Sequence, residues 1–221
     1  MLTFMKNVKK VLGKDGAQSA IHYQKGRAYA SNRCSCIWVE DPSGREGAVD
    51  VTSNLAIEDA QIPDYSKILP ELHGNEPYAT ADADELVEFH AVLKAAIACA
   101  PSPRSVECVL LVWRVDGLTA YVRDDRLRVE YRFSGAIELL GLKGGQSFFA
   151  AFDARRLSEL VDYLRQRKAQ VRIYASASRR SPLRMEVNPD ITAAVPAGGL
   201  IAPLTRFEEE RFADVIPDSA E

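Results

Sequence analysis

Residues 62–70 read Ile-Pro-Asp-Tyr-Ser-Lys-Ile-Leu-Pro. The prolines and the lack of a helical or strand period predict an extended connector. Its apolar residues form no continuous face of their own, so we expect them to dock on neighbouring elements. These residues are Ile62, Tyr65, Ile68 and Leu69. The connector divides the chain into a shorter N-terminal part and a longer C-terminal part.

The longer part reads as a helix, three strands and a short strand, then a second helix and three strands, which is a doubled helix-plus-strands unit. A first helix is predicted from Asp82, because acidic residues occupy its first turn and apolar residues recur on one face. Asp153 is the predicted N-cap of a second helix over residues 154–167. The predicted strands are 106–115, 118–124, 126–134, 147–152, 170–176, 182–187 and 199–205. Antiparallel pairing in such units predicts an α+β fold with the helices on one face of the sheets.

The shorter part resembles an incomplete copy of the same unit. Residues 2–13 place apolar residues at helical spacing with lysines between them, which predicts an amphipathic helix. Strands are expected within residues 20–40, around a Lys25-Gly26 hairpin signal, and one further strand over residues 47–57. We therefore expect three regions: a shortened domain over 1–61, a complete domain with its connector over 62–206, and a loosely attached acidic tail over 207–221.

The overall composition is that of a globular protein with a slightly acidic balance. The 221 residues carry 28 Lys and Arg against 31 Asp and Glu, a formal net charge of -3. This balance argues against coating nucleic acid with the whole surface, but it leaves room for a local basic face. The sequence contains no long apolar run for a membrane span and no secretion signal. Four cysteines are too few for a disulfide framework in this chain, so a cytoplasmic protein with reduced thiols is expected.

Three strings, in this order along the chain, resemble the bacterial-type DNA polymerase sliding clamp, the beta subunit of DNA polymerase III. Residues 62–70 resemble the family's F-P-D-Y-x-R-V-L-P connector into the last domain. Residues 152–157 resemble the F-N-x-x-Y-L start of its final helix, and residues 199–206 resemble its closing strand, which ends V-M-P-M-R-L. Residues 30–36 stand where the family has A-T-D-G-H-R-L, with the glycine, histidine and leucine replaced. The resemblance implies the sliding-clamp fold, in a chain shorter than the family's usual three domains.

Clamps of this family encircle duplex DNA and slide without reading its sequence, so the resemblance implies basic helices lining the hole. The implied DNA-binding residues are Lys6, Lys9, Lys10, Lys14, Arg155, Arg156, Arg165, Arg167 and Lys168. The same pattern also fits the solvated faces of amphipathic helices. The helix from Asp82 argues against a basic lining, because Asp82, Asp84, Glu85 and Glu88 would repel phosphate and only Lys94 would attract it.

The resemblance also implies a hydrophobic pocket for short peptide motifs of a DNA polymerase and a clamp loader. Carried over by position, its residues come from the connector, the closing strand and residues 30–36. They are Pro63, Lys67, Ile68, Leu200, Ala202, Pro203, Leu204, Cys34 and Cys36. Ordinary packing between elements is the alternative interpretation. The replacements at Cys34, Cys36 and Ala202 leave room for a changed peptide specificity.

Other chemistry finds no support in the sequence, and neither a cofactor nor catalysis is expected. Cys34 and Cys36 share one face of a strand, but no second paired motif completes a metal site. Because the chain is shorter than the family's usual three domains, we expect a compact processivity factor of a phage, plasmid or other mobile element, without membrane association.

The predicted assembly is a homo-oligomeric ring. Each chain supplies three helix-and-strand units, whereas a complete ring of the family carries twelve, so we expect three or four chains joined head to tail. The alternative is a clamp-derived interaction module that binds replication proteins without encircling DNA.

Overall fold

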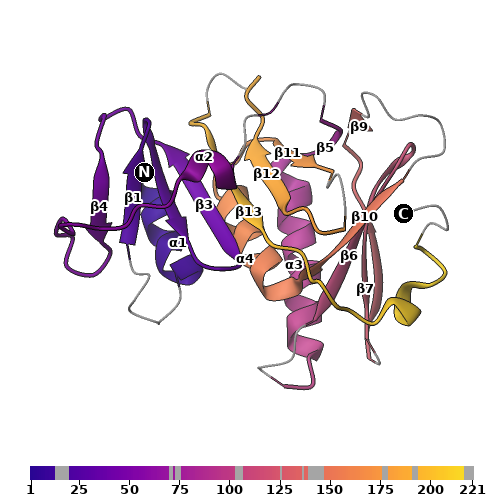
Figure 1. The fold of residues 1–221 in the computed structure, drawn as a ribbon. Coiled ribbons are helices and arrows are strands. Elements are labelled where there is room, and N and C mark those ends of the chain that lie inside the picture. The colour runs from indigo at the N-terminus through magenta and orange to yellow at the C-terminus, as the bar shows by residue number, and fades with distance from the viewer. Residues whose placement is uncertain are drawn as a thin grey trace.

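The computed structural model describes residues 1–12, 20–69, 72, 76–102, 107–124, 126–135, 137–138, 147–175, 179–190 and 194–216. The strands in these residues form two antiparallel sheets, one of nine strands and one of four. Three longer helices pack against the sheets, and α4 (Ala154–Arg165) lies between α1 (Leu2–Leu12) and α3 (Ala83–Cys99) (Figure 1). The predicted α+β architecture, with the helices gathered on one face of the sheets, is confirmed.

Two interlocked units build the longer part of the chain. The first contains α3 and the strands β5 (Tyr78–Ala81), β6 (Cys108–Arg114), β7 (Gly117–Arg123) and β8 (Arg128–Arg132). The second contains α4 and the strands β10 (Phe148–Asp153), β11 (Val171–Tyr174), β12 (Leu183–Val187) and β13 (Ala197–Ile201). Each unit contributes its first strand to the other unit's sheet, because β10 pairs with β6 and β5 pairs with β11. This exchange ties the two units into one domain.

The N-terminal part is a third unit joined to the second by its sheet. It consists of α1 and the strands β1 (Ala20–Gln24), β2 (Arg27–Ser31), β3 (Ser35–Glu40) and β4 (Gly47–Asp50). Strand β3 pairs with β13, so the sheet runs β4-β1-β2-β3-β13-β12-β11-β5-β9, ending at β9 (Ile137–Glu138). Strand β4 pairs with β1 in the position that β5 occupies on β11. In the third unit this position is therefore filled by a strand of the same unit, not by a strand exchanged from another unit.

Glycine is required where β3 and β13 meet. A Cβ on Gly199 would lie 2.5 Å from Leu160 Cδ1 and 2.6 Å from the Cys36 carbonyl oxygen. A Cβ on Gly198 would lie 2.8 Å from Trp38 Nε1. These distances are shorter than real Cβ contacts, so the two glycines allow the close approach of the strand to its neighbours.

Local sequence signals explain both long helices of the complete domain. The Asp82 side chain accepts a hydrogen bond from the Glu85 amide, and the Glu85 side chain accepts one from the Asp82 amide, which forms a capping box. Asp153 caps α4 by accepting hydrogen bonds from the amides of Arg155 and Arg156. Both predicted helix starts are therefore confirmed.

Four features differ from the sequence-based expectations. The connector contains a short helix, α2 (Tyr65–Ile68), and is not extended throughout. Strands β5 and β9 were not predicted, and the strand expected within 47–57 ends at Asp50. The prediction of a loosely attached tail is wrong for residues 207–216, because Phe212 is only 1% exposed in an apolar cluster on the four-stranded sheet. Residues 217–221 lie outside the described residues.

The main core fills the space between the three helices and the sheets. It includes Phe4 from α1, Phe89 from α3, Leu160 from α4 and Trp113 from β6, all almost fully buried. None of the described helices is both long and apolar enough to span a membrane.

Candidate functional site

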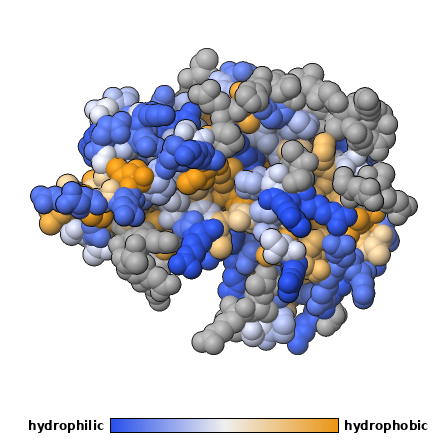
Figure 2. All heavy atoms as spheres, viewed as in Figure 1, coloured by the Kyte–Doolittle hydropathy of each residue, from blue (hydrophilic) through white to orange (hydrophobic). Residues whose placement is uncertain are grey.

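A pocket of about 320 Å³ lies between α2, the entry to β3 and the end of β13. We call it the connector pocket. Apolar surface is visible beside α2 among hydrophilic side chains (Figure 2). The residues that line the pocket are Ser31, Asn32, Arg33, Cys34, Ser35, Cys36, Lys67, Ile68, Pro182, Leu200 and Ala202. The pocket is therefore built by segments distant in sequence, and its walls combine apolar side chains with a polar rim.

Six of the nine residues predicted for a peptide pocket lie together here: Cys34, Cys36, Lys67, Ile68, Leu200 and Ala202. Pro63, Pro203 and Leu204 do not line it. The prediction did not include the other five lining residues, Ser31, Asn32, Arg33, Ser35 and Pro182. Pro182 immediately precedes β12, in a segment without a family-like string, so no sequence signal pointed to it.

Tyr65 holds α2 in place at one wall of the pocket. Its ring stacks on that of Tyr29, with the centroids 4.0 Å apart and the planes 7° from parallel. Its hydroxyl lies 2.6 Å from His22 Nδ1 and 2.9 Å from Ser31 Oγ. Burial raises the pKa of Tyr65 and lowers the pKa of His22, which keeps both groups neutral near pH 7. The Asp64 side chain accepts a hydrogen bond from the Ser66 amide and so caps α2, which presents Lys67 and Ile68 to the pocket.

Asn32 shapes the opposite wall. Its Oδ1 accepts hydrogen bonds from the amides of Cys34 and Ser35, at 2.7 and 2.8 Å. The Cys34 carbonyl accepts one from the Ala202 amide at 2.8 Å, which ties this turn to the chain leaving β13. Cys34 is exposed, whereas Cys36 is buried and burial raises its pKa to about 12. Cys34 is therefore the accessible thiol of the pocket.

Leu204 lies elsewhere because the chain changes neighbours after Ala202. The Leu204 amide donates to the Ala151 carbonyl of β10 at 2.8 Å. Leu204 lines a second cavity, together with Cys108, Arg123 and Phe212. In the predicted closing strand, Leu200 and Ala202 thus line the connector pocket, whereas Leu204 contacts the four-stranded sheet.

The three long helices bring most of the predicted DNA-binding cations onto neighbouring elements, but several are already paired. Lys10 Nζ lies 2.6 Å from Asp162 Oδ2, and Arg165 lies 2.5 Å from Asp162 Oδ1. Although burial opposes the shift, the hydrogen bonds from Lys10 and Arg165 lower the pKa of Asp162. Arg156 lies 3.7 Å from Glu159. These contacts reduce the net positive charge of the helix face.

The remaining predicted cations differ in their surroundings. Arg167 donates to the Tyr163 hydroxyl at 2.6 Å and lies over its ring, so it supports the end of α4. Lys6, Lys9 and Lys168 are exposed and Arg155 is half-buried. Among the described residues, no acidic side chain lies within ion-pair distance of these four. Lys14 lies outside the described residues.

Helix α3 contributes little positive charge to the helix face. Glu85 is buried, belongs to the capping box and accepts a hydrogen bond from the Ser134 amide at 2.5 Å. Glu88 accepts one from the Tyr131 hydroxyl at 3.3 Å. The exposed positions of α3 are Asp84, Val87, Glu88, Ala91, Lys94, Ala95 and Ala98. Of the four acids that argued against a basic lining, Asp82 and Glu85 thus form the capping box, and four of the seven exposed positions of α3 are small and apolar.

Metal binding has no structural support within the described ranges. In them, no group of three or more His, Cys, Asp or Glu side chains is arranged to hold a metal ion.

The architecture is that of the bacterial DNA polymerase sliding clamp. The DNA polymerase III beta subunit of Thermotoga maritima matches 94% of this chain with a TM-score of 0.67 and 14% sequence identity. The beta subunit from the DNA polymerase of Streptococcus pyogenes matches 93% with a TM-score of 0.66 and 10% identity. Caulobacter crescentus pol III beta matches 93% with a TM-score of 0.66 and 14% identity.

This chain spans 64% of the length of each of these three structures. At the level of sequence, no protein-family model and no curated protein matches it. The fold resemblance expected from the three strings is therefore confirmed by structure, although sequence similarity is low.

Proposed function

We propose that the protein is a DNA sliding clamp, a non-catalytic processivity factor that encircles duplex DNA as a homo-oligomeric ring. The observation that carries the proposal is the side-by-side arrangement of α1, α4 and α3 on one face of a continuous clamp-type sheet. In a closed ring these helices would line the hole. Lys6, Lys9, Arg155 and Lys168 would then supply exchangeable contacts to phosphate.

The partial neutralisation of the helix face supports sliding in preference to tight binding. Asp162 and Glu159 already pair with three of the predicted cations. Each phosphate contact contributes a slope of about 0.9 to the dependence of log affinity on log salt. A few unpaired cations per chain would therefore give weak, sequence-independent contacts, while ring closure would provide the retention.

The connector pocket is the proposed attachment site for a DNA polymerase and a clamp loader. Its apolar walls and polar rim suit a short peptide anchored by one or two large side chains. Tethering through such a peptide makes the polymerase's next encounter with DNA intramolecular, which raises its effective concentration. The role of Cys34, Cys36, Lys67, Ile68, Leu200 and Ala202 in this binding is part of the proposal.

Retention on circular DNA tests the ring. Dilute chains are mixed with nicked circular plasmid and concentrated, so that rings can assemble around the duplex, and complexes are separated from free protein by gel filtration. We expect protein to stay on the circle and to be lost after one restriction cut. Equal retention before and after cutting, or none, would contradict the ring and favour the clamp-derived interaction module.

The solution mass gives an independent measurement. Three units per chain point to three or four chains in a ring of twelve or fewer units. Light scattering should therefore find a trimer or tetramer at high concentration, and a strict monomer would exclude a homo-oligomeric ring.

A further inference from the structure

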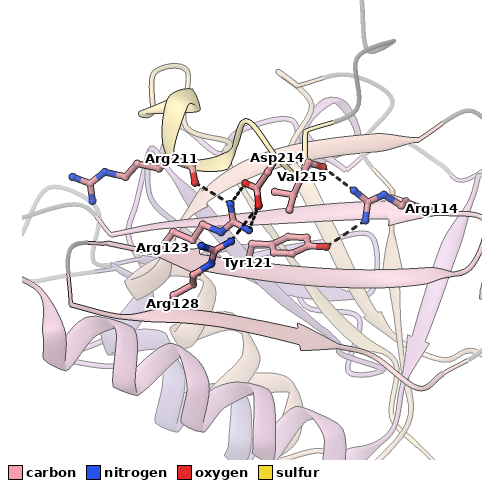
Figure 3. Close-up of polar contacts among 7 residues, drawn as sticks. All are labelled: Arg114, Tyr121, Arg123, Arg128, Arg211, Asp214 and Val215. Atoms are coloured by element: carbon pink, nitrogen blue, oxygen red, sulfur yellow. Dashed lines mark hydrogen bonds and ion pairs between the residues drawn. The ribbon is translucent and has the colours of Figure 1, made fainter.

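The C-terminal segment, residues 207–216, lies across the face of the four-stranded sheet that points away from the helices (Figure 3). Its anchor is Phe212, which is 1% exposed. The floor beneath it is formed by Leu110, Val112, Tyr121, Phe149 and Ala151. We call this floor, with the arginines around it, the outer groove. An apolar floor of this kind would be exposed if the segment left it.

Arginines surround the floor and bind the segment's acidic and carbonyl groups. Arg123 forms an ion pair with Asp214, and Arg128 lies 3.2 Å from the same carboxylate. Arg114 donates to the Val215 carbonyl at 2.8 Å, and Arg179 lies 3.2 Å from Glu209. These charges are complementary to a segment that contains four acidic residues, Glu208, Glu209, Glu210 and Asp214.

The segment is held as a bound peptide would be held. It forms no strand of the sheet, and its regular structure is a single 3-10 turn over Glu209–Phe212. It contacts the groove through the buried Phe212 ring, the partly buried side chains of Phe207, Val215 and Ile216, and hydrogen bonds and ion pairs to the arginines. A cavity of about 450 Å³, lined partly by Phe207, Phe212 and Arg123, remains beside it. Arg123 Nε is buried there without a hydrogen-bond partner among the described residues.

We propose that the outer groove is a second protein-docking site, for a partner segment with an aromatic anchor flanked by carboxylates. The chain's own residues 207–216 occupy this groove and compete with the partner. Because the segment is tethered a few residues from β13, its effective concentration is in the millimolar range. The site therefore opens only when the segment's own contacts, the Phe212 anchor or the Asp214 ion pairs, are weakened or displaced. This proposal is independent of ring formation and of the connector pocket.

A labelled peptide of residues 207–216, added to the full-length chain, tests the site. Phe212→Ala weakens the internal anchor, and Asp214→Asn removes the ion pairs with Arg123 and Arg128. We expect each variant to bind the peptide at least tenfold more tightly than the wild type does. Glu210→Gln is the matched control, because Glu210 is exposed and forms no ion pair within the described residues. It should bind like the wild type.

Two further arms define the chemistry of the ligand. A peptide in which both phenylalanines are replaced by alanine should lose binding to the Asp214→Asn chain, and so should the intact peptide when Arg123→Ala is added. Melting curves identify any variant that is unfolded. If Phe212→Ala fails to fold, the peptide-binding test rests on Asp214→Asn, which leaves the apolar anchor in place. The proposal is overturned if neither variant gains affinity, if the alanine peptide binds equally well, or if gained binding reflects only exchange of the segment between two copies, seen as dimers by light scattering.

Discussion

At the residue scale, Tyr65 anchors α2 and thereby positions one wall of the connector pocket. Its stacking on Tyr29 and its hydroxyl contacts with His22 and Ser31 link the connector to β1 and β2. Of the four connector residues predicted to dock, Tyr65 and Leu69 are buried and Ile62 is partly buried, but Ile68 is 39% exposed. The partners of Tyr65 could not be predicted, because they lie more than 30 positions away in the sequence.

Replacing Tyr65 by Phe keeps the stacking and removes the hydroxyl. We expect a loss of about 1 kcal/mol in unfolding free energy, the typical net value of a buried hydrogen bond, measured by urea denaturation. Tyr23→Phe is the control, because the buried Tyr23 ring contacts Arg45 and its hydroxyl forms no hydrogen bond within the described part of the chain. An equal loss in both variants would contradict a specific role for the Tyr65 hydroxyl.

His90 makes the helix packing sensitive to pH. Burial between α3 and α4 is the main cause that lowers the pKa of His90. The positive charges of Arg165, Lys94 and Lys10 lower this pKa further, and the Asp162 carboxylate opposes the shift. A lowered pKa means that the unfolded chain binds the proton more readily. The stabilising contribution is therefore present above the ordinary value of 6.5 and is lost as the pH falls below it.

We expect the unfolding free energy to decrease between pH 7 and pH 5, and the His90→Gln variant to show a shallower slope. Removal of one titrating site can reduce the slope by at most about 1.4 kcal/mol per pH unit. Denaturant titrations at several pH values measure this. His22, whose pKa is also lowered by burial, should account for part of the remaining slope. Identical slopes in the variant and the wild type would show that His90 does not titrate in this range.

At the scale of elements, sequence periodicity predicted the long helices and most strands, because their apolar faces and caps are local signals. It missed α2 because four residues are too short to form a helix without tertiary support, here the Asp64 cap and the Tyr65 stacking. It missed β5, Tyr-Ala-Thr-Ala, because this strand depends on its pairing with β11. In the C-terminal segment, the acidic residues concealed the single aromatic anchor.

The candidate site was predictable only in part, for a related reason. The strings at 62–70 and 199–206 identified Lys67, Ile68, Leu200 and Ala202, which lie together. The same strings also suggested Pro63, Pro203 and Leu204, which do not line the pocket. Pro203 and Leu204 follow Ala202, and there the Leu204 amide bonds to β10.

Helix α1 is the element with the clearest unpaired positive charge. Lys6→Gln with Lys9→Gln should weaken binding to duplex DNA for all sequences equally. It should reduce the slope of log affinity against log salt by up to about 1.8 for each chain in the ring, or about 0.9 for each lost phosphate contact. Lys25→Gln, which removes an exposed lysine from the β1–β2 turn, is the control. Fluorescence anisotropy at several salt concentrations measures the slope, and an unchanged slope in the double variant would remove α1 from the DNA-facing surface.

At the scale of the whole molecule, the junction of β3 and β13 joins the N-terminal unit to the complete domain. Because β4 fills the free position on β1, the N-terminal unit needs no strand from another chain there. The four-stranded sheet, in contrast, ends at β8, whose outward positions Arg128, Glu130 and Arg132 are exposed. This edge is available for contact with another subunit of the proposed ring.

Gly199→Ala tests the β3–β13 junction. The new Cβ would collide with the Cys36 carbonyl oxygen and Leu160, so one of these elements must shift. We expect a loss of about 1–3 kcal/mol in unfolding free energy, the range typical of overpacked sites. The variant should also bind less at the connector pocket, because Cys36 and Leu200 belong to both structures. An unchanged denaturation midpoint would contradict the close approach of the two strands.

The β3–β13 pairing also determines when the protein can fold. Strand β3 ends at Glu40 and its partner β13 begins at Ala197. At a synthesis rate of about 5–20 residues per second, β3 emerges from the ribosome roughly ten to thirty seconds before β13 exists. During this interval one edge of the N-terminal unit remains open, and unpaired strand edges favour aggregation. Contacts of such long sequence separation also slow folding. The same strand pairing that makes the sheet continuous thus delays completion of the N-terminal unit until the chain is nearly finished.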